Sequence, residues 1–519
     1  MAFSLDLKRV LISDNVDRCC QTILEANGIH VDLKTKLTKE ELLAEIPNYD
    51  GMIVRSATKV TADVIKAGKN LKIIGRAGTG VDNIDIPAAS LQGIIVMNTP
   101  GGNTISAAEQ TCVLISTLAR HIPQAAASMK EGKWDRKKYM GSELLGKTLA
   151  IVGLGRIGRE VAHRMQSYGM TTIGYDPLVP ADEAARFNIE WMELDQLWPK
   201  ADYITVHTPL IPQTRGLLGD KTFPLCKKGV YVVNCARGGI IDEASLLNAL
   251  ESGQCAGAGL DVFETEPPTA TGVSAQLVQH PNIIACPHLG ASTVEAQTRV
   301  AKEIAEQFVD AVKGKSLFGV VNATFLTEAL KPEAQPWLTL GDKLGKVAAC
   351  ILQGKVTKVT VITHGNELKS AGRYVTAAVS AGIMGGSDVN LVNSAVISKE
   401  KGCEVSSSHT DTVGLPYISA VSVTVHGDGK DSSISGTVIG IGVPVLIKFN
   451  SLVFSGGVPL SGNLCFVSGK PGNVLPDFVS KFGDNGTINH VHVAGGGSEG
   501  IVVFNTSSKI SVDYPCVAL

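Results

Sequence analysis

The sequence lacks the features of several protein classes. Its 519 residues include no uninterrupted apolar run of about eighteen residues, which a membrane-spanning helix would need. An excess of one charge is also lacking, because 47 basic and 49 acidic residues leave a formal net charge of −2. No positive field therefore favours nucleic acid or an anionic membrane as a partner.

The eleven cysteines lack the paired spacing of metal sites, and the adjacent Cys19 and Cys20 fit no common ligand pattern. We therefore expect no metal. No secretory signal precedes the first apolar run, Arg9 to Ser13, so we expect a cytoplasmic protein with free thiols. A hydrophobic content of 44% is ample for several cores, and the length predicts three or four domains.

Short apolar runs alternate with helical stretches in the N-terminal part of the chain. Strands are expected at 10–12, 51–54, 72–76 and 94–98, and helices at 38–46, 62–67 and 106–120. A second such pattern begins at Lys147, with strands expected at 148–152, 172–175, 203–207, 230–234, 258–261 and 283–286. The second pattern predicts a parallel dinucleotide-binding sheet. A helix over 293–312 would return the chain to the first domain, so the second domain is expected to be inserted into the first.

A glycine-rich segment, Gly153-Leu154-Gly155-Arg156-Ile157-Gly158, follows one of these strands and opens a helix. Its glycines permit a tight turn, the approach of a pyrophosphate, and close packing of helix on strand. The next strand ends at Asp176. A carboxylate there accepts both ribose hydroxyls and repels a 2′-phosphate, so the predicted cofactor is NAD rather than NADP.

Three segments that follow strands contain the candidate catalytic residues Arg237, Glu266 and His288. Oxidation of a secondary alcohol needs a base for the hydroxyl proton, and histidine suits neutral pH. A carboxylate beside the imidazole would orient it and stabilise its charged form. A guanidinium can hold a substrate carboxylate and polarise a carbonyl. Taken alone, each of the three would more often be a structural residue.

In this order and spacing, the three segments resemble those of the D-isomer-specific 2-hydroxyacid dehydrogenases. The resemblance covers residues 5 to about 320. It implies an α/β fold in which a Rossmann dinucleotide-binding domain is inserted into a flavodoxin-like catalytic domain. It implies His288 as the acid/base, Glu266 as its partner, and Arg237 as the clamp on the substrate. It also implies NAD contacts from Thr79, Thr208, Cys235, Ala236, Asp261, Gly290 and Ala291.

A phosphorylated substrate would need a second anion site. Arg55 and Arg76 follow strands of the first domain, and Asn103 lies at the expected hinge. The basic loop around Arg136 is expected to reach the cleft of a partner subunit in a homodimer or homotetramer. These segments resemble a long branch of the family, which implies oxidation of D-3-phosphoglycerate to 3-phosphohydroxypyruvate, the first step of the phosphorylated pathway of L-serine biosynthesis.

Beyond about residue 325 no chemical constellation appears. The long branch carries an α+β intervening domain and an ACT-like regulatory domain in this region. The loop from Val467 to Gly472 lacks the His and Asn of the family's serine-sensing loops, so serine is expected to have little effect. The expected domains are 1–100 with 290–320 for substrate, 101–289 for NAD, 325–455 as the intervening domain, and 458–519 as the ACT-like domain.

Two other functions remain open. A glyoxylate or hydroxypyruvate reductase shares the fold but would need neither the C-terminal extension nor the basic residues around the cleft. An NAD-sensing corepressor keeps the fold and the three candidate catalytic residues, but lacks the extension, and no basic nuclear-targeting run is present here.

Overall fold

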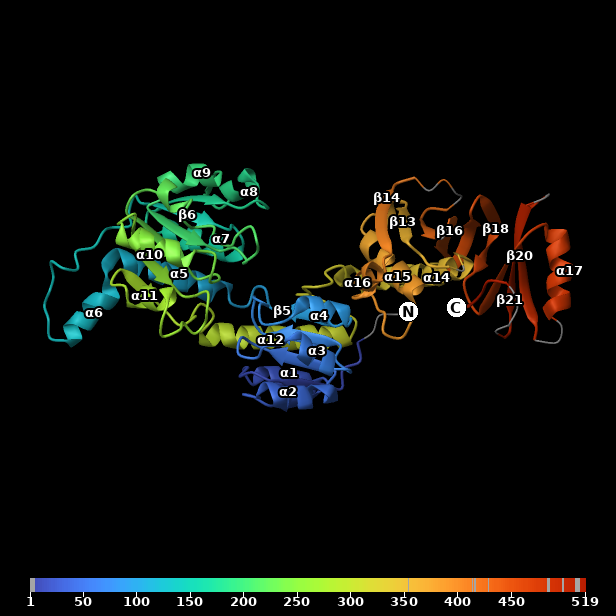
Figure 1. Cartoon of the computed structure of the whole chain (residues 1–519), viewed down its shortest axis with the longest axis horizontal. Coiled ribbons are helices and arrows are strands. Elements are labelled where there is room, and N and C mark those ends of the chain that lie inside the picture. The colour runs from blue at the N-terminus through green and yellow to red at the C-terminus, as the bar shows by residue number, and fades with distance from the viewer. Residues whose placement is uncertain are drawn as a thin grey trace. The chain divides into compact units, whose positions relative to one another are not determined.

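The computed structural model describes residues 5–352, 354–412, 414, 417–427, 429–482, 486–496, 499–508 and 514–519. They form two compact units (Figure 1): Met1–Thr99 with Ala301–Leu519, and Pro100–Val300. Helix α12 (Val294–Val312) begins in the second unit and ends in the first. The second unit is therefore an insertion in the chain of the first, in agreement with the predicted fold class.

The first unit contains a five-stranded parallel sheet in the order β2-β1-β3-β4-β5. Its strands are β1 (Arg9–Ile12), β2 (His30–Leu33), β3 (Gly51–Val54), β4 (Ile73–Arg76) and β5 (Ile95–Asn98). The helices between them are α1 (Cys19–Ala26), α2 (Lys39–Glu45), α3 (Ala62–Ala67) and α4 (Ile86–Leu91). The sequence predicts four of these strands and misses β2. In this edge strand only Val31 is buried, so it lacks the continuous apolar run of a central strand.

Helix α12 lies against this sheet where glycine leaves room for it. A Cβ built on Gly75 of β4 would lie 2.5 Å from Cε2 of Phe308, and one on Gly51 of β3 would lie 3.2 Å from Cε1 of the same ring. Phe308 is fully buried. Residue 75 must therefore be glycine for the helix to approach this closely, and residues after 300 complete the core of this domain.

The chain that follows α12 lies along β5. The amide of Asn98 donates to the carbonyl of Gly319 at 2.9 Å, and the amide of Val321 donates to the carbonyl of Val96 at 2.8 Å. These bonds satisfy backbone groups of β5 on the side away from β4. The segment thereby protects an edge of the sheet that would otherwise be open to pairing.

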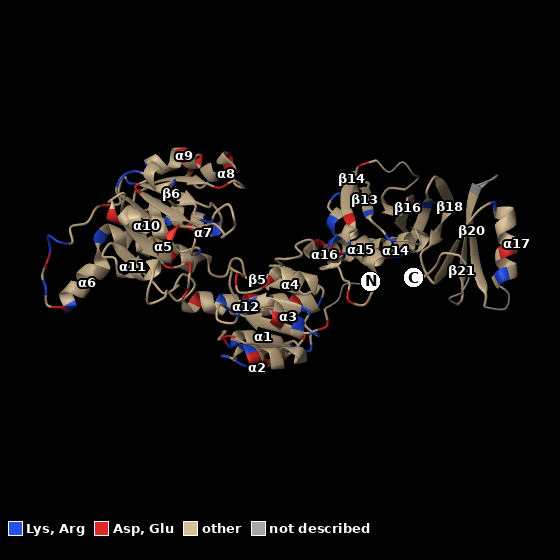
Figure 2. Cartoon of the chain, in the orientation of Figure 1, with Lys and Arg blue, Asp and Glu red and all other residues tan. Residues whose placement is uncertain are grey.

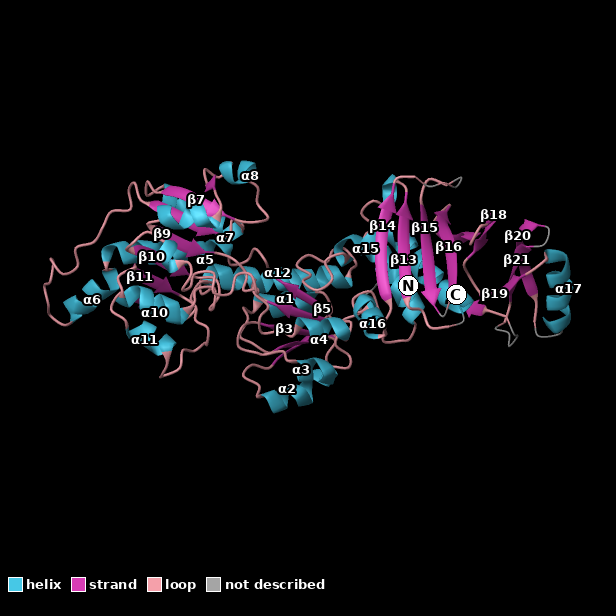
Figure 3. Ribbon diagram, turned by 45° about the horizontal axis from the view of Figure 1, so that its top comes forward, coloured by secondary structure: helices cyan, strands magenta, loops and turns pink. Residues whose placement is uncertain are grey.

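The second unit contains a seven-stranded parallel sheet in the order β12-β11-β10-β9-β6-β7-β8 (Figure 3). Its strands are β6 (Thr148–Val152), β7 (Thr171–Tyr175), β8 (Glu190–Trp191), β9 (Tyr203–Val206), β10 (Val230–Asn234), β11 (Cys255–Leu260) and β12 (Ile283–Ala285). Its helices are α5 (Thr104–Arg120), α6 (Ile122–Lys130), α7 (Arg156–Gln166), α8 (Ala181–Ala185), α9 (Leu194–Leu197), α10 (Glu243–Glu251) and α11 (Val273–Gln279). One face of the sheet packs against α5 and α7, and the other against α10 and α11. All six predicted strands are present, and only the two-residue β8 is missed.

The first unit continues into two further sheets. A six-stranded sheet has the order β14-β13-β15-β16-β17-β18, and a four-stranded antiparallel sheet has the order β20-β21-β19-β22. The strands are β13 (Lys358–His364), β14 (Glu404–Thr410), β15 (Ala420–Gly427), β16 (Lys430–Ile439), β17 (Val443–Phe449), β18 (Leu452–Pro459), β19 (Asn463–Ser468), β20 (Ile488–Gly496), β21 (Glu499–Thr506) and β22 (Cys516–Ala518). The helices are α13 (Leu326–Ala329), α14 (Gln335–Leu352), α15 (Gly372–Met384), α16 (Ser394–Glu400) and α17 (Pro471–Phe482). The predicted change of architecture after about residue 325 is therefore confirmed.

One expectation about the cysteines is wrong. Cys465 of β19 and Cys516 of β22 form a disulfide, whereas the other nine cysteines are free thiols. The two residues face each other across antiparallel strands that are 51 positions apart in the sequence, so their spacing carried no signal.

The near-zero net charge of the sequence suggests that basic and acidic residues are mixed along the chain. Figure 2 shows basic and acidic residues interspersed along the chain rather than gathered by sign, with few of either on strands β15 to β21. None of the helices in the described ranges combines the length and the apolar character that a membrane crossing requires.

Removing the side chain of Asn322 should destabilise the domain of the five-stranded sheet. Its Oδ1 accepts from the amide of Val96 at 2.9 Å, and its Nδ2 donates to Ser90 Oγ at 3.0 Å and to the carbonyl of Ile94 at 2.9 Å. Asn322→Ala should lower the free energy of unfolding by about 1–3 kcal/mol, measured by urea denaturation. The matched change Asn48→Ala removes one bond of an exposed side chain and should cost less than about 0.5 kcal/mol. Equal losses would contradict a special role for Asn322.

Candidate active site

The glycine-rich turn lies between β6 and the start of α7. A Cβ on Gly153 (φ 101°) would lie 2.5 Å from the carbonyl oxygen of His207, and a Cβ on Gly158 would lie 2.1 Å from that of Gly153. Around Gly155, in contrast, no atom lies within 4 Å of the Cβ position. The first and third glycines are therefore needed for packing, and the second leaves open space beside the helix N-terminus.

Two polar side chains mark this turn as a place for a ligand. Asp176 follows β7, and its carboxylate accepts from the amides of Leu154 and Leu178 at 2.9 and 2.8 Å. Thr208 lies beside Gly153, and its buried hydroxyl has no hydrogen-bond partner among the described residues. Buried hydroxyls usually have a hydrogen-bond partner, so this one is available to a ligand that binds at the turn. With Arg156 and Ile157 in the first turn of α7, these residues fit a dinucleotide whose pyrophosphate lies at the helix N-terminus.

Glu266 and His288 form a close pair. Nδ1 of His288 lies 2.7 Å from Oε2 of Glu266, and both side chains are partly exposed to solvent. Burial raises the pKa of Glu266, but the hydrogen bond and charge of His288, the amide of Phe263 and the charge of Arg237 together lower it below its ordinary value. An ionised carboxylate only accepts hydrogen bonds, so Nδ1 of His288 is the donor. Nε2 of the neutral ring then carries the lone pair that can take a proton.

The backbone around His288 is anchored by Asp261. The Asp261 carboxylate accepts from the amides of Leu289 and Gly290 at 2.7 and 2.8 Å, and its carbonyl accepts from the amide of His288 at 2.9 Å. These bonds hold His288 at a φ of 54°, a conformation that residues other than glycine rarely adopt. Burial raises the pKa of Asp261, although the two amides oppose that effect. Asp261 therefore positions the imidazole loop, and its expected contact with NAD remains a prediction.

The loop that carries Arg237 is fixed in a similar way. Asn234, the last residue of β10, accepts from the amide of Ala236 at 2.9 Å and donates to the carbonyl of Arg237 at 2.8 Å. A Cβ on Gly238 would lie 1.9 Å from the carbonyl oxygen of Phe263. The arginine loop and the loop that leads to Glu266 are thus packed backbone to backbone. The structure therefore brings all three candidate catalytic segments together.

Glu243 is a functional candidate that sequence reasoning misses. It is buried, its Oε1 accepts from the amide of Glu264 at 2.7 Å, and its Oε2 accepts a short hydrogen bond from the hydroxyl of Ser274. It therefore holds the loop two residues before Glu266. In the sequence it is only an acidic residue in the first turn of a helix, after the N-cap Asp242, and nothing there signals this contact.

The remaining predicted NAD contacts in this unit lie near the same loops. Cys235 and Ala236 follow β10, and burial raises the pKa of the Cys235 thiol, so it stays protonated. Gly290 is buried, with its Cβ position 3.2 Å from Asp261 Oδ2, and the carbonyl of Ala291 accepts from Gln297 at 2.6 Å. The contacts of these four residues with NAD stay predictions.

Two other histidines of this unit, His207 and His280, are alternatives to His288 as the acid/base, and both have structural roles. Burial lowers the pKa of His207 to about 4, so this ring is neutral, and its Nε2 lies 3.1 Å from the hydroxyl of Thr205. His280 ends α11, and its Nδ1 accepts from the amide of Asn282 at 3.2 Å. Neither ring has a carboxylate partner in these contacts, unlike His288.

The predicted anion-binding residues of the first unit follow neighbouring strands. Arg55 follows β3, Arg76 ends β4, and these strands pair in parallel, so both arginines lie at the same edge of the sheet. A Cβ on Gly78 would lie 3.0 Å from a guanidinium nitrogen of Arg76, so glycine leaves room for that side chain. Thr79 donates from its hydroxyl to the carbonyl of Thr99 at 3.3 Å.

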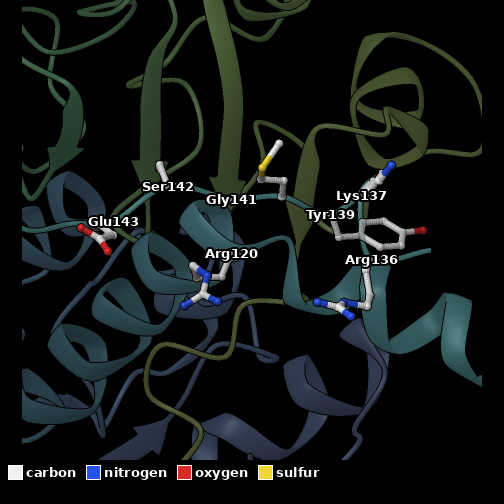
Figure 4. A pocket seen from close by; sticks show the side chains of 8 residues that line it. Arg120, Arg136, Lys137, Tyr139, Gly141, Ser142 and Glu143 are labelled. Atoms are coloured by element: carbon white, nitrogen blue, oxygen red, sulfur yellow. The ribbon is translucent and has the colours of Figure 1, made fainter. Parts of the chain in front are cut away.

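Asn103 and Arg136 belong to the second unit. Asn103 directly precedes α5, and its carbonyl accepts from the amide of Ala107 at 3.0 Å. Arg136 lies in the exposed loop after α6. Figure 4 shows it with Arg120 and Lys137 around a cavity of about 750 Å³, whose lining includes none of the three candidate catalytic residues. Arg136 thus lines a hollow that the candidate catalytic residues do not share.

Comparison with known proteins agrees with this geometry. Residues 112–290 match the NAD binding domain of the D-isomer specific 2-hydroxyacid dehydrogenases, and residues 333–450 match the D-3-phosphoglycerate dehydrogenase intervening domain. The chain is 54% identical to the D-3-phosphoglycerate dehydrogenase of Rattus norvegicus over 465 residues, which are 89% of this chain and 86% of that protein. It is also 54% identical to that of Homo sapiens over 469 residues, 89% of this chain and 87% of that protein. The crystal structure of the TT0316 protein from Thermus thermophilus is 31% identical, with a TM-score of 0.54, and the match covers 60% of this chain and 99% of that one.

Replacing Asp176 should weaken the binding of NAD. Loss of a charged hydrogen-bonding partner typically costs about 1.5–3 kcal/mol, so Asp176→Ala should raise the Kd for NAD roughly ten- to a hundredfold. The same change should reduce the preference of the protein for NAD over NADP. Fluorescence titration with both nucleotides measures the change. Asp182→Ala, an exposed acidic residue in the first turn of α8, is the matched control and should bind NAD normally. If the unmodified protein binds NADP as tightly as NAD, the assignment of Asp176 is wrong.

Proposed function

Because this chain belongs to the D-3-phosphoglycerate dehydrogenase family, within the NAD-dependent D-2-hydroxyacid dehydrogenases, we propose that it oxidises D-3-phosphoglycerate to 3-phosphohydroxypyruvate. This reaction is the first step of the phosphorylated route to L-serine. The observation that carries the proposal is the pair of Glu266 and His288, 2.7 Å apart, in the domain that holds the glycine-rich turn.

The residues of this domain can perform the proton transfer. NAD, held by the glycine-rich turn and Asp176, would supply the acceptor for the hydride that leaves C2 of the substrate. Nε2 of neutral His288 takes the hydroxyl proton, and ionised Glu266 stabilises the imidazolium that forms. Arg237 holds the substrate carboxylate and polarises the C2 oxygen as it becomes a carbonyl. In reduction of the 2-oxo acid, the protonated imidazole returns the proton.

The phosphate of the substrate is assigned to the first domain. Arg55 and Arg76, at one edge of its sheet, supply the guanidinium groups, with Asn103 at the connection between the domains. Arg136 is assigned to the phosphate of a partner subunit's substrate, within a cytoplasmic homodimer or homotetramer. Substrate binding would then belong to 1–100 with 290–320, NAD binding to 101–289, and assembly or regulation to 325–455 and 458–519. Thr79, beside Arg76, would contact NAD from the substrate domain.

The phosphate site also separates this function from the two alternatives. A glyoxylate or hydroxypyruvate reductase acts on a substrate without phosphate, and an NAD-sensing corepressor needs no turnover. Neither explains the match of residues 333–450 to the intervening domain of D-3-phosphoglycerate dehydrogenases. NADH formation by the purified chain from D-3-phosphoglycerate, D-glycerate and D-lactate tests the proposal. Equal or better turnover of D-glycerate would refute it.

Removing the charge of Glu266 should move the pH dependence of oxidation. Because its pKa is lowered, Glu266 is ionised throughout the neutral range and favours the charged form of His288. Oxidation requires the neutral ring, so Glu266→Gln should shift the rising limb of the oxidation rate toward acid by about one pH unit or more and lower kcat. Glu264→Gln, an exposed acid on the same loop, should leave the limb in place. An unchanged profile for Glu266→Gln would remove this residue from the mechanism.

A chain that ends after Leu330 should fold, bind NAD and oxidise D-3-phosphoglycerate, because all the candidate site residues precede it. An end at Val321 would remove the three hydrogen bonds of Asn322, so that shorter chain should be less stable.

Serine should have little effect on the full-length chain, since Val467 is buried in the core beneath α17. Turnover of both lengths, with and without serine, measures these expectations. A folded but inactive chain ending at Leu330 would show that the C-terminal half contributes to the active site.

A further inference from the structure

We propose that Asp14 is a positioning residue for substrate binding, because its buried carboxylate holds the loop Arg55–Thr58 that presents Arg55 to the substrate phosphate. The proposal deepens the function proposed above and rests on it. All the residues that carry it belong to the first domain.

The topology places Asp14 beneath this loop. Strand β1 ends at Ile12, and β3, its parallel neighbour, ends at Val54. The segments that follow the two strands therefore leave the sheet side by side at its carboxyl edge, where ligands of open α/β sheets bind. Asp14 is only 6% exposed there, so its charge must be satisfied by the protein.

Three donors of the loop converge on the Asp14 carboxylate. Oδ2 accepts from the amide of Arg55 at 2.6 Å and from the amide of Thr58 at 3.2 Å, and Oδ1 accepts from the hydroxyl of Thr58 at 2.6 Å. The buried hydroxyl of Ser13 donates in turn to Thr58 Oγ1 at 3.0 Å. Both ends of the loop are thus tied to the end of β1.

Asn83 holds the same loop through its carbonyl groups. Its Nδ2 donates to the carbonyl of Arg55 at 2.7 Å and to that of Thr58 at 2.6 Å. Ser56 and Ala57, at the tip between them, are exposed. The loop is therefore fixed at its ends by two side chains and open at its tip, as a preorganised binding loop requires.

The carboxylate of Asp14 lies near the proposed phosphate site, where its negative charge would repel the phosphate. Its presence there has to be explained. Burial lowers the pKa of Arg55 and the charge of Asp14 opposes that effect, so the carboxylate offsets part of the cost of burying this charged guanidinium. The three hydrogen bonds that the loop donates to Asp14 offset much of the negative charge that this carboxylate would otherwise present to the solvent side of the loop. Asp14 therefore stabilises the charge of Arg55 and also fixes the geometry of its loop.

The test measures steady-state kinetics of the full-length chain carrying Asp14→Ala, Asp14→Asn or Thr58→Val. The matched control is Asp50→Ala, at the opposite edge of the same sheet. Oδ2 of Asp50 also accepts two backbone amides, from Lys8 and Arg9 at 2.9 and 3.0 Å. This control loses comparable hydrogen bonds without touching the loop.

Asp14→Ala should raise the KM for D-3-phosphoglycerate about tenfold or more, with kcat and the KM for NAD changed less than about threefold. Asp14→Asn should recover most of the affinity, because the amide oxygen can still accept from the two backbone N–H groups while Nδ2 donates to Thr58. Thr58→Val should raise the KM by a smaller factor, and Asp50→Ala should leave it unchanged. If Asp14→Ala does not fold, the rise of KM in Thr58→Val decides, with Asp14→Asn as the conservative comparison.

A KM for D-3-phosphoglycerate that stays within about twofold of the unmodified value in folded Asp14→Ala, or in Thr58→Val where Asp14→Ala does not fold, would overturn the proposal. So would an equal rise of KM in Asp50→Ala, since the effect would then be general loss of stability. If the unmodified chain fails to oxidise D-3-phosphoglycerate, the proposed function itself is refuted, and this proposal with it.

Discussion

Both parallel sheets of the dehydrogenase half impose one constraint: the carboxyl ends of neighbouring strands meet at a single edge. Arg55 and Arg76 follow β3 and β4 in one sheet. In the other sheet, the glycine-rich turn follows β6, and the loops of Arg237 and His288 follow β10 and β12. Every candidate catalytic residue therefore lies in a loop that follows a strand of one of these sheets. The positions of these residues depend on how the loops are held.

The loops are held by buried or partly buried side-chain oxygens that accept backbone amides. Asp14 does so for the loop of Arg55, Asp176 for the glycine-rich turn, Glu243 for the loop of Glu266, and Asp261 for the loop of His288. Charge-assisted hydrogen bonds of this kind are stronger than neutral ones and fix the direction of the backbone. Much of the negative charge of these acidic residues is thereby offset by the protein's own amides.

Hydrogen bonds join the C-terminal half to the turn between α4 and β5. Asn390 donates to the carbonyl of Gly93 at 3.0 Å, and Asn393 donates to that of Leu91 at 3.3 Å. A Cβ on Gly93 would lie 2.3 Å from Asn390 Nδ2, so this close contact requires glycine. The turn leads directly into β5, and it is the same segment that Asn322 contacts. Asparagine side chains therefore join the extension to this domain.

The sequence by itself determined the Rossmann sheet, the glycine-rich turn and the three candidate catalytic segments, because these signals are local. Buried parallel strands are continuous apolar runs, and a glycine turn between strand and helix is contiguous in the chain. Edge strands such as β2 and β8 are short and half-exposed, so their residues carried no such pattern. Only the tertiary structure decided which polar groups became partners across long separations. Asp14 meets Arg55 across 41 residues, Glu243 meets Glu264 across 21, and Cys465 meets Cys516 across 51. Such pairings depend on which strands lie side by side, a property of the whole fold that no local segment contains.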